Sequence, residues 1–97
     1  MDTILSINLI VSNPKVRGGR PVIAGTGVRV TDVVMLMLFH NQNPSEIAAS
    51  YAVSLAQVHA ALAYYYEHKS DIDEDIRKQI ALAREMKEKG VGLRALS

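Results

Sequence analysis

Apolar and polar residues follow two different rhythms along this chain. In residues 1–30, short apolar runs at 7–11, 21–24 and 28–30 are separated by glycine, proline and polar residues. These runs are rich in β-branched residues and predict three short strands, with turns between them. Strands this short make a weak sheet on their own, so we expect them to pack on helices or to pair with a second copy of the chain.

From residue 31 onward, the apolar positions recur at helical spacing. The unbroken apolar run 33–39 predicts a helix that is apolar on nearly all sides and therefore forms the buried centre of the fold. Thr31 is expected to cap this helix, with Asp32 in its first turn, where a carboxylate favours the helix dipole. The helix is expected to end near His40 and Asn41.

A last helix is predicted over residues 70–90, from Ser70 as its cap to Gly90 as its end. Four acids complement the dipole in and around its first turn: Asp71, Asp73, Glu74 and Asp75. One face of this helix is an apolar stripe, which has two interpretations: it closes the core, or it binds a partner protein. We expect Ile72 and Ile76 in the core, and the candidates for partner binding are Ile80, Met86 and Leu93.

The stretch from residue 43 to residue 66 predicts two helices joined by a tight turn. Asn43 is a good cap with Pro44 and Glu46 behind it, and Ser54 with Gln57 forms a second capping box. Between the two starts lie residues that can form one small core: Ile47, Ala48, Tyr51, Val53 and Val58. This pattern is typical of a helix-turn-helix, whose second helix usually enters the major groove of DNA.

Contact with DNA would come from the start of the second helix, through Ser54, Gln57 and His59. That helix, predicted over 55–66, contains no lysine or arginine. A helical hairpin that only builds a core therefore fits these residues about as well as a DNA reader.

Charge is unevenly distributed although the net charge is only +1. From Lys15 to Arg29 there are four cations and no acid, so Arg17, Arg20 and Arg29 are candidates for contacts with DNA phosphates. The alternative is that these cations only solubilise a strand-rich segment.

Other features limit the possible functions. The chain has no cysteine, its three histidines lack metal-site spacing, and no nucleophile or phosphate-loop motif is present. We therefore expect no enzyme activity, metal or cofactor. No signal peptide is recognisable and the longest apolar run is too short to cross a bilayer, so a cytoplasmic location is expected.

Residues 18–26, Gly-Gly-Arg-Pro-Val-Ile-Ala-Gly-Thr, follow the pattern GG-[KR]-P-x-I-x-GT. Together with the helical segments after them, they resemble the bacterial and archaeal family catalogued as domain of unknown function 433, from Ile10 to His68. The resemblance implies a homeodomain-like helix-turn-helix and an antitoxin that binds a PIN-like ribonuclease toxin and represses its own operon. Gly27 stands where family members often carry arginine, and Arg29 lies on the same face of an extended segment.

These observations predict a single α+β domain, mainly helical, over residues 1–97. It comprises an N-terminal β segment (1–30), a three-helix helix-turn-helix unit (31–68) and a C-terminal helix (70–90). The expected function is that of an antitoxin-like homodimer that binds a PIN-like toxin and operator DNA. The alternative is a protein-interaction scaffold that does not bind DNA.

Overall fold

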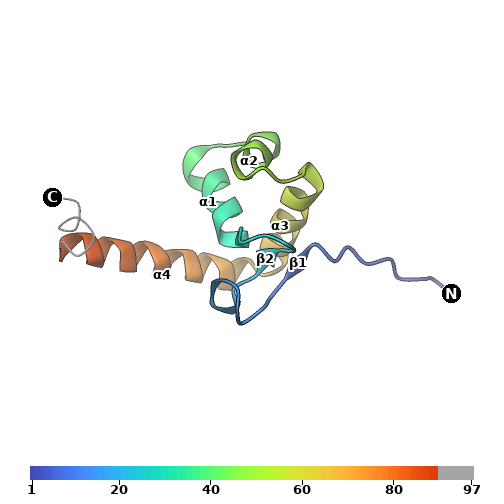
Figure 1. Ribbon diagram of the computed structural model, residues 1–97, viewed down its shortest axis with the longest axis horizontal. Helices are drawn as coiled ribbons and strands as arrows, with labels where there is room; N and C mark the ends of the chain where they lie inside the picture. Colours follow the sequence, from blue (N-terminus) through green and yellow to red (C-terminus); the bar gives the residue numbers. More distant parts are fainter. Residues whose placement is uncertain (90–97) are drawn as a thin grey trace.

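A computed structural model describes residues 1–89 and shows a small head with two projections (Figure 1). Two strands, β1 (Ile10–Val11) and β2 (Val22–Ile23), are separated by a short 3-10 helix, η1 (Arg17–Gly19). Four helices follow, namely α1 (Val30–His40), α2 (Pro44–Tyr51), α3 (Leu55–Glu67) and α4 (Lys69–Glu88). The fold is α+β and mainly helical, as the sequence predicts.

The β segment is a two-stranded antiparallel sheet in which Ile10 lies opposite Ile23. Both strands are shorter than the apolar runs that contain them. The third strand expected at 28–30 is wrong: Arg29 makes only an isolated bridge with Val22, and Val30 already begins α1. The helix begins there because Asp32 accepts a hydrogen bond from the backbone N–H of Arg29, at 2.9 Å.

The core lies where β2 and the four helices meet. Its fully or nearly fully buried side chains come from every one of these elements. They are Ile23, Val30, Val33, Val34, Ile47, Val58, Ala61, Leu62, Tyr65, Ile72 and Ile76. Burial of these apolar side chains is the main favourable contribution to the stability of so short a chain.

Two expectations about α1 need correction. Thr31 does not cap the helix; it lies inside the first turn, is buried, and its hydroxyl has no partner among the described residues. Only the first half of α1 is buried, whereas Leu38 and Phe39 are 46% and 55% exposed. The helix leaves the core after its first two turns because no other element of the described chain covers its far end. Its end at His40, with Asn41 in a left-handed conformation, agrees with the prediction.

Helix α4 begins at Lys69, so Ser70 is not its cap. His68 follows the last residue of α3 and precedes the first residue of α4, so a single residue separates the two helices. The molecule measures 62 Å along its longest axis against 27 and 24 Å, because α4 and the N-terminal segment extend to opposite sides of the head (Figure 1). The predicted end at Gly90 lies outside the described residues.

Within residues 1–89, none of the helices alone has the length and apolar character to cross a membrane. Helices α2 and α3 reach that level only when taken together, and they bend by 113° at the break between them.

Candidate DNA and partner interfaces

Both predicted capping boxes of the α2–α3 pair are present. Asn43 accepts from the backbone N–H of Glu46 at 2.9 Å, and the Glu46 carboxylate accepts in return at 3.0 Å. Ser54 and Gln57 do the same at the start of α3, at 3.1 and 2.7 Å. These reciprocal bonds satisfy backbone groups that a helix start otherwise leaves unpaired, so they fix where each helix begins.

The turn between α2 and α3 is three residues long. Ala52 is left-handed, with φ of 54°, and the backbone N–H of Val53 donates to the carbonyl of Ala48 at 3.0 Å. The helices cross at 113°, with Ile47 and Val58 fully buried between them. The predicted small core of this pair is therefore confirmed, with Ala48, Tyr51 and Val53 packed at its edge.

The start of α3 offers little polar chemistry to a ligand. Side chains of Ser54 and Gln57 are engaged with each other's backbone, while His59 is exposed beside Leu55 and Ala56. Helix α3 contains no lysine or arginine from its first residue to its last. The exposed surface at the start of α3 is therefore mostly apolar and carries one imidazole group.

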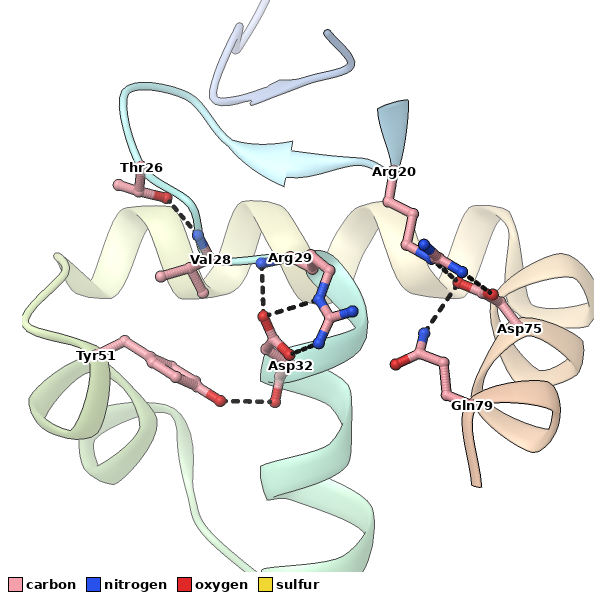
Figure 2. A network of polar contacts seen from close by, with 8 residues as sticks. All are labelled: Arg20, Thr26, Val28, Arg29, Asp32, Tyr51, Asp75 and Gln79. Carbon is pink, nitrogen blue, oxygen red and sulfur yellow. Dashed lines mark hydrogen bonds and ion pairs between the residues drawn. The ribbon is translucent and has the colours of Figure 1, made fainter. Parts of the chain in front are cut away.

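Two of the three candidate arginines are paired with acids of the same chain (Figure 2). Arg29 holds Asp32 through two nitrogens, at 2.8 and 3.2 Å. The hydrogen bonds to Asp32 raise the pKa of Arg29. Arg20 reaches Asp75 on α4 at 3.1 Å, and Gln79 donates to the same carboxylate. Each of these guanidinium groups therefore ties the β segment or its end to a helix.

Arg17 differs from the other two arginines. It is exposed, adopts a left-handed conformation with φ of 51°, and begins η1. The loop that holds it lies below β2 and the start of α4 in Figure 1, whereas α3 begins at the opposite side of the head, next to α2. The structure thus places the loop of Arg17 away from the start of α3. Arg29 lies closer to that start, because the hydroxyl of Tyr51, three residues before Ser54, donates to the backbone carbonyl of Asp32 at 3.3 Å.

The glycine motif has a structural explanation. Gly18, Gly19 and Gly25 all have a positive φ angle, at 67°, 82° and 77°. Residues that have a Cβ atom rarely adopt such a backbone conformation. Thr26 closes the second turn: its hydroxyl donates to the carbonyl of Ile23 at 2.8 Å and accepts from the N–H of Val28 at 3.0 Å. The motif shapes the two turns around β2 and delivers Arg29 to the start of α1.

The first half of α4 is tied to α3 by polar contacts that the sequence did not predict. The buried Tyr65 donates to Asp73 at 2.8 Å, and Lys69 pairs with the same carboxylate at 2.8 Å. These two hydrogen bonds, with Lys69 the stronger influence, lower the pKa of Asp73. Burial, followed by the bond to Asp73, raises the pKa of Tyr65. Asp73 near the start of α4 therefore accepts hydrogen bonds from specific side chains and also complements the helix dipole.

The candidate partner-binding residues have different environments. Ile80 is half-buried against the core, Met86 is 43% exposed, and Leu93 lies outside the described residues. Leu82, which the apolar stripe did not include, is 57% exposed one helical turn before Met86. Its spacing of four residues from Met86 was the signal that could have identified it.

Comparison with known proteins places the chain in a family. Residues 10–65 match the family described as "Protein of unknown function (DUF433)", and this range is more than half of the chain. The protein therefore belongs to this family. The matched range runs from β1 to Tyr65 in α3 and does not include α4. No curated protein and no solved structure matches the chain.

Proposed function

We propose that this protein is an antitoxin-like protein whose α4 helix binds a PIN-like ribonuclease toxin and whose α2–α3 pair contacts operator DNA. The observation that carries the proposal is the end of α4. Residues 81–89 are all exposed, yet they include Leu82 and Met86 at a spacing of four, which places both on adjacent turns of the helix. An amphipathic helix that extends beyond its own core is a common way to fill a groove of a partner.

Charge supports the same partner. The exposed segment of α4 carries Arg84, Lys87 and Lys89 against Glu85 and Glu88, so its balance is positive. The PIN-like partner that we expect is a small acidic protein with several spaced aspartates, encoded beside this one. Cations around an apolar pair therefore suit a surface on which carboxylates surround a hydrophobic groove.

The test is a double substitution, Leu82→Glu with Met86→Glu, in the full chain. We expect this variant to keep the melting temperature and helix content of the wild type, because neither side chain belongs to the core, and to lose co-purification with the toxin encoded beside it. Ser45→Glu, at an exposed position of α2, is the matched control and should bind normally. Normal toxin binding by the double variant would contradict the role of α4.

The DNA part of the proposal is supported by the α2–α3 geometry. A crossing of 113° with a short turn lies within the range of helix-turn-helix motifs, and α3 presents its first turns to solvent. His59→Glu should abolish a mobility shift with the upstream DNA, since a carboxylate would approach phosphates. Ala81→Glu, at an exposed position of α4 outside the α2–α3 pair, serves as the control. An unchanged shift for His59→Glu would exclude α3 from the interface.

A protein-interaction scaffold without DNA binding is a second candidate, and a specific observation favours it. Arg20 and Arg29 are paired internally and α3 has no cation, so the phosphate contacts that dominate DNA affinity have few sources here. The two candidates differ in the salt dependence of binding to DNA. Toxin binding combined with no DNA shift at any salt concentration would select the scaffold.

A further inference from the structure

The N-terminal segment is extended and uncovered. Residues 1–8 are all exposed and lie outside any helix or strand, and the chain then enters β1. Ile4, Leu5 and Ile7 are 89%, 88% and 79% exposed. In Figure 1 this segment leaves the head on the side opposite α4. Three large apolar side chains within four residues of an extended segment are unfavourable in water unless something covers them.

The strand that continues this segment has an open edge. Within the described chain the sheet contains only β1 and β2, so β1 has one neighbouring strand. The N–H of Ala24 donates to the carbonyl of Leu9 at 2.8 Å, which directs the backbone groups of Leu9 toward β2. Because these groups alternate along a strand, those of Asn8 and Ile10 point toward the outer edge. A further strand can pair there.

The charge pattern of this segment suits pairing with itself. Residues 3–14 carry no charge, and the first charges on either side are Asp2 and Lys15. When two identical copies pair antiparallel, the acidic end of one meets the basic end of the other. Such a pairing therefore brings opposite charges together at both ends and no like charges in the middle.

The edge also has room for the side chains of a second strand. An apolar groove of about 250 Å³ lies between the N-terminal segment and α3. Its lining residues are Ile7, Ile10, Ala60, Ala63, Tyr64 and Glu67. A strand added at the outer edge of β1 would lie over this groove and shield its apolar lining from water.

We propose that residues 5–11 pair antiparallel with the same residues of a second copy, with Asn8 opposite Asn8 across a two-fold axis. The two sheets then form one four-stranded sheet in the order β2, β1, β1 of the second copy and β2 of the second copy. Four strands are stable where an isolated pair of two-residue strands is marginal. This interface goes beyond the function proposed above and does not depend on it, because it requires neither toxin nor DNA.

The register makes a sharp test possible, since residue 8 meets its own copy. Asn8→Asp and Asn8→Lys each place two like charges face to face, so each variant alone should dimerise severalfold more weakly than the wild type in sedimentation velocity. An equimolar mixture of the two should restore the dimer as a heterodimer. Ala49→Asp and Ala49→Lys on α2 are the matched controls and should dimerise as the wild type does.

A covalent test uses the absence of cysteine from this chain. Residues opposite each other in an antiparallel pair have Cα atoms about 4.5–5.5 Å apart, which a disulfide can bridge. Asn8→Cys should therefore oxidise rapidly to a disulfide-linked dimer, whereas Ala49→Cys should not. A wild-type protein that stays monomeric at every concentration would overturn the proposal. The proposal would also be overturned if Asn8→Asp and Asn8→Lys weakened toxin binding and left dimerisation unchanged. That result would indicate that the toxin binds the outer edge of β1.

Discussion

The two halves of α4 both carry apolar residues at helical spacing but have different surroundings. From Lys69 to Ile80, apolar side chains are buried against the head, Tyr65 and Lys69 hold Asp73, and Arg20 holds Asp75. From residue 81 to residue 89 every residue is exposed, and the ion pair of Lys89 with Glu85 is local to the helix. One helix therefore serves as a core element at one end and as a free surface at the other.

The difference between the halves lies in what surrounds them. The same apolar spacing that buries Ile72 and Ile76 continues past Ile80, but the head ends there. An apolar stripe indicates a helix face that is stabilised by burial. Whether the same chain buries that face depends on which other elements pack against the helix. Changes in the first half of α4, and in the α3 residue that contacts it, should therefore affect stability more than changes at exposed positions.

The largest contrast is between two truncations of apolar side chains. Ile76→Ala should lower the free energy of unfolding by about 2–4 kcal/mol, because it leaves a cavity in a core position that is 3% exposed. Leu82→Ala in the exposed half should change it by less than about 0.5 kcal/mol. Urea unfolding followed by circular dichroism measures both. A large loss for Leu82→Ala would mean that the end of α4 is covered within the protein itself.

A second contrast removes one hydroxyl group. Tyr65→Phe breaks the hydrogen bond to Asp73 and should cost about 1 kcal/mol, since the donor is buried and the acceptor is charged. Tyr66→Phe, one residue later on the exposed side, is the control and should be close to neutral. Equal effects of the two changes in urea unfolding would argue against a role for the Tyr65–Asp73 contact.

Asp75→Asn tests the link between the β segment and α4. The change weakens the bond to Arg20, which is partly exposed, so a loss of about 0.5–1 kcal/mol is expected. Glu85→Gln breaks the corresponding pair in the exposed half and should have no measurable effect. A double-mutant cycle between Arg20→Met and Asp75→Asn isolates the pair, and a coupling energy of zero would mean that the link is not stabilising.

The smallest effect is a pH dependence. Lys69 and Tyr65 lower the pKa of Asp73 below its ordinary value of 3.8, so the stability that the carboxylate contributes is present above about pH 4. It is lost as the pH falls through the lowered value, because the unfolded chain then takes up the proton first. Thermal melting between neutral and acid pH should show a steeper decline for the wild type than for Asp73→Asn. Parallel curves would assign the decline to other groups.

The sequence predicted best where structure depends on near neighbours. The boxes at Asn43–Glu46 and Ser54–Gln57 involve residues three apart, and both form as predicted. The cap expected at Thr31 is wrong because the backbone N–H of Arg29 donates to the carboxylate of Asp32, so that the helix begins directly after Arg29. Ser70 failed because α4 follows α3 with only His68 between them. Several neighbouring residues can cap the same helix start, and which of them does so depends on the conformation of the chain that precedes it.

The candidate site was harder to predict than the fold. Arg20 stands in a segment without acids and therefore resembled a phosphate-binding residue, but its carboxylate partner Asp75 is 55 residues away in sequence. Ile72 and Ile76 were correctly placed in the core because they are close to the compact part of the chain. Contacts between distant segments determine which charges remain available, and composition does not contain that information.

We propose that the two halves of α4 have different roles, the first in the core and the second in binding a partner. Hydrogen–deuterium exchange along α4, with and without the PIN-like toxin, tests it most directly. Slow exchange is expected at residues 72–80 in both states, with protection of residues 82–88 only when the toxin is bound. Unchanged exchange at 82–88 in a complex that does form would contradict it.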